Sequence, residues 1–216
     1  FTLSDKGYPS LSNSEEVSFS LMLDNEFSDF SETSSIDRRV NSFMKKWKIK
    51  GASLAVTKDE KLVYAKGFGI ANSETDEDVK PGHLFRIASV SKLITAVAIM
   101  KLYEDGTLDL DEQVFGEEGI LNDSIYRIYR DQRIEKITVK HLLNHTAGWS
   151  RYSGDPMFKP LYIARKMNVE PPASFSNVLQ FTLSKRLNYT PGSRYSYSNL
   201  GYAILGEIVA RKSGMP

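Results

Sequence analysis

Apolar residues recur at helical spacing near the start of the regularly patterned part of the chain. Between residues 36 and 47 they fall on one face of a helix, and charged residues occupy the other face; the apolar set is Ile36, Val40, Phe43 and Trp47. This spacing predicts an amphipathic helix, with Ser35 as its N-cap.

Two short runs rich in apolar residues follow this helix. They cover residues 52–57 and 62–68, and the polar segment 58–61 joins them. Short runs of this kind around a polar connection predict an antiparallel hairpin. The segment from Ile36 to Phe68 is therefore expected to form a helix followed by a hairpin.

The segment from Ser89 to Tyr103 has apolar residues all around the helix axis, and Gly106 follows it. Such a pattern predicts a helix that is buried on most sides, with the glycine ending it. The segment from Asp111 to Lys136 is charged and lacks a period, which predicts an excursion over the surface.

The remaining periodic segments predict three shorter helices separated by turns. Residues 149–175 carry four prolines and little period, and Pro191-Gly192 predicts a turn. The expected helices cover residues 139–144 after a Thr138 cap, residues 175–187, and residues 200–212 ending at Gly214.

The first 35 residues differ in composition from the rest. They hold ten serines among acidic and amide residues, without a sustained helical or strand period. We expect residues 1–35 to be a poorly ordered leader or tether, and residues 36–216 to form the ordered part.

Composition narrows the range of possible functions. The chain has 216 residues, a formal net charge of +1 and no cysteine. The balanced charge argues against nucleic acid as a partner, and the absence of cysteine excludes thiolate catalysis and cysteine-bound metals. The longest apolar stretch, residues 93–100, is too short to span a bilayer.

Two Ser-x-x-Lys patterns occur, a number that chance alone produces in a chain rich in both residues. Ser42 and Lys45 lie on the polar face of the first helix, which indicates an ordinary surface. Ser89 instead begins the apolar helix, so Lys92 should lie one turn away on the same face and partly out of water. Burial lowers a lysine pKa, and a neutral amine can accept a hydroxyl proton. The alternative is that Ser89 is only an N-cap and that Lys92 extends to solvent.

Tyr197-x-Asn199 is the second candidate. It occurs once, between the Pro191-Gly192 turn and the last helix, a position that can present side chains to a cleft. Tyr197 could equally be a packed aromatic residue and Asn199 a helix cap.

Together these motifs resemble the serine beta-lactamase and penicillin-binding-protein superfamily, and most closely its class C branch, in which Tyr-x-Asn replaces Ser-x-Asn. The resemblance covers about residues 36–216. Its supporting blocks are Phe85 to Lys92, Gly106 to Asp111, His141 to Gly148 and Pro191 to Tyr202.

The resemblance implies an α+β fold of the beta-lactamase/transpeptidase type, with a helical region packed against an antiparallel sheet. It also implies acyl transfer to Ser89, with Lys92 and Tyr197 sharing the proton and Asn199 binding substrate, without a metal or organic cofactor. Expected substrates are beta-lactams, D-amino-acid peptides or esters met outside the cytoplasm, as in the bacterial periplasm. The alternative is a non-catalytic ligand-binding or sensor module on the same scaffold.

The sequence departs from the family pattern in one respect. The third family motif, Lys or His, then Thr or Ser, then Gly on a sheet strand, is matched only by Lys212-Ser213-Gly214, where Gly214 is better explained as a C-cap. His141 and His145 are expected to be structural, and His83 an ordinary loop residue. With only one hairpin predicted, the C-terminal sheet strands are expected to be missing from this chain. A further stretch of the protein or a second polypeptide would then complete the sheet.

Overall fold

The structure is a computed structural model that describes residues 2–3, 9–10 and 33–215. The chain divides into two compact units, residues 1–86 and 87–216. In the N-terminal segment, the two-residue strands β1 (Thr2–Leu3) and β2 (Pro9–Ser10) pair antiparallel. Most of the expected leader or tether, residues 1–35, lies outside the described residues, and its order remains a prediction.

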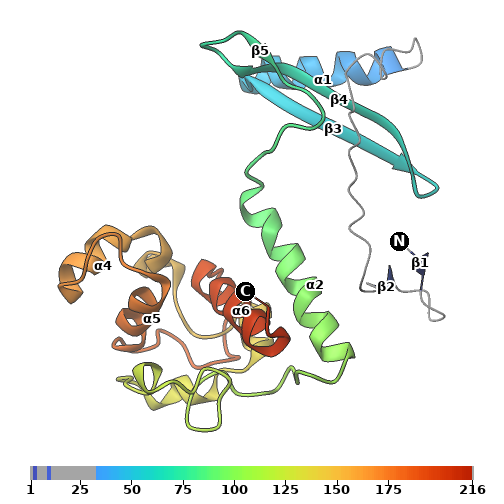
Figure 1. The fold of residues 1–216 in the computed structure, drawn as a ribbon. Helices are drawn as coiled ribbons and strands as arrows, with labels where there is room; N and C mark the ends of the chain where they lie inside the picture. The colour runs from blue at the N-terminus through green and yellow to red at the C-terminus, as the bar shows by residue number, and fades with distance from the viewer. Residues whose placement is uncertain (1, 4–8, 11–32, 216) are drawn as a thin grey trace. The chain divides into compact units, whose positions relative to one another are not determined.

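The first unit contains one helix and a small antiparallel sheet, as the sequence predicts (Figure 1). The helix α1 spans Ser34–Trp47 and begins two residues earlier than expected, because it follows Thr33 rather than a Ser35 cap. The sheet has the order β3-β4-β5. Its strands are β3 (Gly51–Lys58), β4 (Lys61–Asn72) and the short β5 (Glu77–Asp78).

Helix α1 packs on the β3–β4 hairpin through a small apolar cluster. Met44 of α1 is buried with Tyr64 and Phe68 of β4. The prediction that Phe43 and Trp47 belong to this face is wrong, because both are mostly exposed. The helix packs on the hairpin through residues spaced four apart, Ile36, Val40 and Met44. Phe43 and Trp47 therefore lie at the edge of the apolar stripe.

The hairpin turn consists of two residues, Asp59 and Glu60, and both have positive φ. A left-handed conformation at both central positions matches the right-handed twist of the flanking strands. The polar segment 58–61 therefore makes the tight connection that the sequence predicts.

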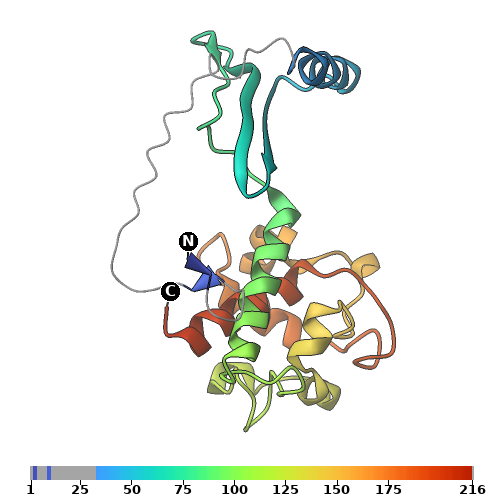
Figure 2. The ribbon, with the colours of Figure 1, turned by 90° about the vertical axis from the view of Figure 1, so that its right-hand side faces the viewer.

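The second unit is helical, and a single apolar core holds it together. Helix α6 runs beside α2, while α4 and α5 pack against each other (Figures 1 and 2). The helices are α2 (Ser91–Glu104), α3 (Val139–Leu143), α4 (Pro160–Met167), α5 (Phe175–Leu183) and α6 (Asn199–Ser213).

The burial predicted for the helix that follows Ser89 is wrong. In α2 only Ile99 is buried, whereas Leu93, Ile94 and Val97 are each at least 60% exposed. One face of α2 packs on α6, and no described residue of the same unit covers the apolar residues on the other side.

The expected surface excursion at residues 111–136 is also wrong. Phe115, Leu121 and Ile134 in this segment are fully buried in the core of the second unit. The segment forms short 3₁₀ turns, such as Gln132–Lys136, which bury single apolar side chains without any repeating period.

The remaining helix predictions differ mainly in their boundaries. Thr138 caps α3, and Gly214 ends α6 with a φ of 70°. Helix α5 ends at Leu183, four residues early, and α4 was not predicted. The expected combination of a helical region with a small antiparallel sheet is present in the described residues.

Candidate active site

Ser89 lies in a tight turn directly before α2. The 3₁₀ turn Ala88–Val90 leads into the helix at Ser91, so the expected helix start at Ser89 is two residues early. Ala88 has a φ of 45°, which is unusual for a residue with a side chain. Backbone strain of this kind is often found where a side chain must be presented in one orientation. Here it precedes an exposed Ser89.

Lys92, in the first turn of α2, points toward Ser89 and toward the start of α6. Its Nζ is 3.4 Å from Ser89 Oγ and donates to Asn199 Oδ1 at 2.7 Å. The same ammonium lies 5.0 Å from the centroid of the Tyr197 ring. Lys92 is half-buried, as the sequence predicts.

Tyr197 and Asn199 are held in place by the start of α6. Ser198, between them, is the N-cap, and its side chain accepts a hydrogen bond from the backbone N–H of Gly201. The residues on either side of the cap then face Ser89 and Lys92, and Tyr197 Oη is 2.7 Å from Ser89 Oγ. Side chains 108 residues apart in sequence thus meet at the N-terminal ends of two helices.

The charges and hydrogen bonds of the cluster make the Tyr197 phenol more acidic. Interaction with Lys92, and secondly the hydrogen bond with Ser89, lower the pKa of Tyr197 below its ordinary value of 10.0. A phenol of lowered pKa beside a hydroxyl and an ammonium can exchange a proton with the hydroxyl. The cluster therefore has the components needed to activate a serine nucleophile.

His145 lies beneath the cluster and has structural contacts. Its ring is 4.6 Å from that of Tyr197 and 4.9 Å from that of Tyr202, centroid to centroid. Its Nδ1 accepts the backbone N–H of Ser198. Burial, and secondly the charge of Lys92, lower the pKa of His145, which favours the neutral form of the ring.

The other two histidines also have local contacts. His141 Nδ1 accepts the Thr138 backbone N–H in the capping box of α3. His83 Nδ1 accepts the backbone N–H of Lys80 in a loop. These contacts agree with the structural roles that the sequence predicts.

Two residues of the site were missed by the sequence analysis. Asp155 accepts the backbone N–H of Asn199 through Oδ2 and that of Met157 through Oδ1. Tyr202 packs beside Lys92 and donates its hydroxyl to Leu143 O. Asp155-Pro156 is a typical cap signal for a short turn, but its contact with Asn199 spans 44 residues and leaves no local pattern.

Lys212-Ser213-Gly214 does not lie in the cluster. Lys212 Nζ donates to Glu112 Oε1 at 2.7 Å, and Gly214 is the left-handed C-cap of α6. None of the strands that the structure describes carries the third family motif. The interpretation of Gly214 as a cap is confirmed.

The described part of the chain offers no metal site and no membrane span. It contains no cluster of three or more His, Asp or Glu side chains that could hold a metal ion. Among its helices, none is both long enough and apolar enough to cross a bilayer.

Comparison with known proteins places this chain in a family. The chain belongs to the beta-lactamase family, whose model matches residues 36–216. It is 27% identical over 174 residues to Protein flp of Staphylococcus aureus strain N315, covering 81% of this chain and 32% of that protein. It is 28% identical over 184 residues to Esterase EstB of Burkholderia gladioli, covering 84% of this chain and 45% of that protein.

Solved structures share the fold. The octameric penicillin-binding protein homologue from Pyrococcus abyssi aligns with a TM-score of 0.65 and 31% identity, over 85% of this chain and 40% of that one. A class C beta-lactamase aligns with a TM-score of 0.65 and 22% identity, over 85% of this chain and 44% of that one, which shows a common fold. The chain thus spans less than half the length of each of these proteins, and its resemblance to the serine beta-lactamase and penicillin-binding-protein superfamily is confirmed.

Proposed function

We propose that the chain carries the nucleophile side of a serine hydrolase that works through an acyl-enzyme intermediate. The observation that carries the proposal is the three-way cluster of Ser89, Lys92 and Tyr197, with Asn199 holding the lysine. General membership in a hydrolase family supports it.

In the first step, Ser89 Oγ forms a bond to the carbonyl carbon of the substrate. The hydroxyl proton passes to the Lys92–Tyr197 pair, which delivers it to the leaving nitrogen or oxygen as that bond breaks. The two groups act as one proton-holding unit, so neither alone is the base. Water then releases the acyl group, with Tyr197 accepting a proton from it.

Asn199 and the Ser89 backbone complete the proposed roles. Asn199 Oδ1 keeps the Lys92 ammonium beside Ser89, which leaves the Asn199 amide nitrogen available to a substrate carbonyl. The backbone N–H of Ser89 is one donor of an oxyanion hole, a contribution of about 3 kcal/mol per donor in enzymes of this kind.

The proposed substrates are beta-lactams, D-amino-acid peptides or esters, met outside the cytoplasm of a bacterium. Support comes from relatives whose names include an esterase and a penicillin-binding protein homologue.

Covalent labelling tests the proposal. A fluorescent penicillin and a fluorophosphonate probe should each label the chain, and Ser89→Ala should abolish the label. Ser42→Ala, which alters the other Ser-x-x-Lys pattern on an exposed helix face, should label like the unaltered chain. A label that persists in Ser89→Ala contradicts the proposal.

A second candidate is a ligand-binding or sensor module without turnover. The position of Lys212-Ser213-Gly214 away from the cluster favours it, because the described strands supply no second oxyanion donor from such a motif. Reversible binding of a penicillin without covalent label supports this candidate over the hydrolase.

We also propose that further polypeptide, from the same protein or from a partner, covers the exposed side of α2 and supplies the missing strand. The exposed Leu93, Ile94 and Val97 support this proposal. These 216 residues alone should then turn over substrate several powers of ten more slowly than a complete homologue. Equal kcat/KM values, measured with one ester substrate, would contradict it.

A further inference from the structure

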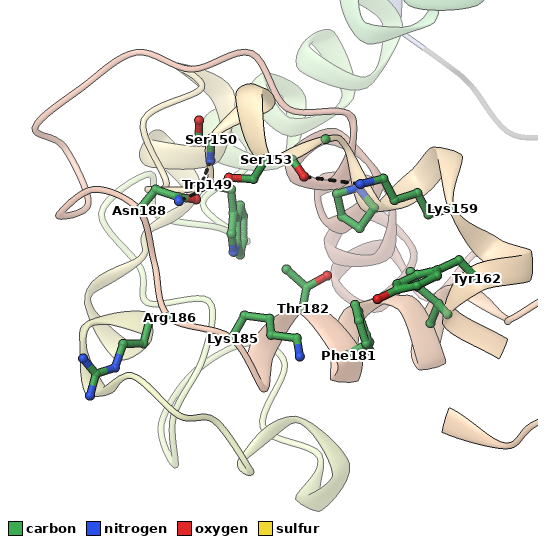
Figure 3. Close-up of a pocket in the computed structure, with 13 residues that line it drawn as sticks. Trp149, Ser150, Ser153, Lys159, Tyr162, Phe181, Thr182, Lys185, Arg186 and Asn188 are labelled. Carbon is green, nitrogen blue, oxygen red and sulfur yellow. Dashed lines mark hydrogen bonds between the residues drawn. The ribbon is translucent and has the colours of Figure 1, made fainter. Parts of the chain in front are cut away.

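A separate cavity of about 290 Å³ lies in the second unit, between α4, α5 and the segment 149–159 (Figure 3). The residues that line it do not include Ser89, Lys92, Tyr197 or Asn199. It is therefore distinct from the proposed catalytic cluster. The lining segment still touches the chain around the start of α6, because Arg151 donates its backbone N–H to Ser196 Oγ and Asp155 accepts the backbone N–H of Asn199.

The inner walls of the cavity are mainly aromatic and aliphatic. Trp149 faces Thr182 across the opening, and Phe181 and Tyr162 form the opposite side (Figure 3). Tyr162 and Phe181 meet edge to face, with ring centroids 6.2 Å apart. Flat walls of this kind suit a planar apolar group.

The charged side chains that line the cavity are all positive. Its lining includes Lys159, Lys185 and Arg186 but no described Asp or Glu, and no described carboxylate forms an ion pair with any of the three. In Figure 3 Arg186 points away from the other lining side chains, so the two lysines are the cations placed to contact a ligand.

Both lysines are held at the cavity by local contacts. Lys159 Nζ donates to Ser153 O at 3.3 Å. It passes so close to Gly154 that an added Cβ there would be 2.3 Å from it, and the φ of 81° at Gly154 also favours glycine. Lys185 Nζ lies 4.7 Å from the centroid of the Phe181 ring.

The indole of Trp149 carries a donor without an acceptor. The Nε1–H of Trp149 is buried and has no hydrogen-bond partner among the described residues. An unpaired buried donor costs roughly 1–3 kcal/mol. The nitrogen is itself closed to solvent, so a ligand in the cavity meets Trp149 through the face of its ring and not through this donor.

We propose that this cavity binds a small aromatic anion, such as an arenesulfonate or aryl carboxylate. The ring of the ligand lies between Trp149 and Phe181, and its acid group contacts Lys159 and Lys185. The site is independent of Ser89, so the proposal does not depend on the hydrolase function.

Isothermal titration calorimetry on the full chain tests this site with benzenesulfonate and its neutral analogue benzenesulfonamide. Benzenesulfonate should bind with a dissociation constant of about 1 mM or tighter, and benzenesulfonamide at least about fivefold more weakly. Lys185→Met should weaken benzenesulfonate binding about fivefold, and Lys159→Met together with Lys185→Met about tenfold or more. Lys136→Met makes the same change of charge at an exposed site away from the cavity and should have no effect.

Tryptophan fluorescence locates the bound anion. The chain has two tryptophans, so Trp47→Phe leaves only Trp149 to report, and benzenesulfonate should change its emission with the same dissociation constant. Ser89→Ala should bind equally well. The proposal is overturned by no binding to the unaltered chain, by equal binding of the neutral analogue, by unchanged binding in the double lysine variant, or by loss of binding in Ser89→Ala.

Discussion

Tyr197 connects the two helices at the candidate site through a single hydroxyl. Its Oη is 2.7 Å from Ser89 Oγ, and its pKa is lowered by Lys92 and Ser89. A side chain in this position can take the serine proton directly, whereas a neighbouring surface tyrosine cannot.

We therefore predict that Tyr197→Phe slows covalent labelling of Ser89 by about a hundredfold or more, because it removes one member of the Lys92–Tyr197 proton-holding pair and leaves the ring in place. The measurement is the second-order rate of labelling by a fluorescent penicillin. Tyr195→Phe is the matched control: Tyr195 is exposed and touches His145 only edge-on. Equal rates for the two variants would remove Tyr197 from the mechanism.

His145 makes the stability of the second unit depend on pH. Its folded pKa is below the ordinary 6.5, owing first to burial and then to Lys92. The unfolded chain thus binds more protons than the folded chain below about pH 6.5. The contribution of His145 to the free energy of unfolding is therefore fully present at neutral pH, and it is lost as the pH drops toward the folded pKa.

His145→Asn should flatten this dependence, since asparagine cannot be protonated, tolerates the φ of 56° at this position and offers an oxygen near the place of Nδ1. The measurement is the free energy of unfolding in urea at pH 7 and pH 5.5. If the difference between the two pH values is as large in the variant as in the unaltered chain, His145 is not its source.

Among the helices and strands, patterns that are local in sequence were predictable. The helix–hairpin opening, the Thr138 cap and the Gly214 stop each depend on neighbours within a few residues, and all three are present. The candidate site residues Ser89, Lys92, Tyr197 and Asn199 were predicted from two short motifs near helix starts, and the structure brings these four side chains together.

Features that depend on distant contacts were not predictable. Asp155 reaches Asn199 only because the chain folds back over 44 residues. Phe115 is fully buried without any periodic neighbour, since it lies in an irregular segment between α2 and α3. The exposure of α2 likewise depends on what covers it, which apolar composition alone does not specify.

Two glycines in the second unit should respond in opposite ways to alanine. Gly148 has a φ of 110°, and an added Cβ would be 2.5 Å from Tyr189 O, so Gly148→Ala should destabilise by about 2 kcal/mol or more. Gly206 is an exposed position within α6 with no neighbour near an added Cβ, and Gly206→Ala should stabilise by roughly 0.5–1 kcal/mol.

Urea unfolding followed by circular dichroism measures both glycine variants. Loss of stability in Gly206→Ala, or no loss in Gly148→Ala, would be inconsistent with the backbone conformations described above.

At the scale of the whole molecule, the side of α2 that the second unit leaves uncovered can drive association. Leu93, Ile94 and Val97 are adjacent on one helix and mostly exposed, and contiguous apolar patches of this kind promote association. The 216-residue chain should therefore self-associate as its concentration rises.

Ile94→Lys combined with Val97→Lys should weaken this association about tenfold, without a large change in the unfolding free energy. Sedimentation velocity over a range of concentrations measures it. Ile128→Lys, at another exposed position, should leave the association unchanged. A chain that stays monomeric throughout the concentration range would show that the exposed side of α2 does not drive self-association.

The left-handed torsion of Ala88 limits how the serine–lysine pair could be transplanted. An ordinary helix start with serine and lysine three residues apart would keep their spacing but lack the bend that turns the hydroxyl toward the phenol. A designer who grafts the pair onto another scaffold should therefore copy the backbone from residue 87 onward, with glycine as the natural replacement at position 88.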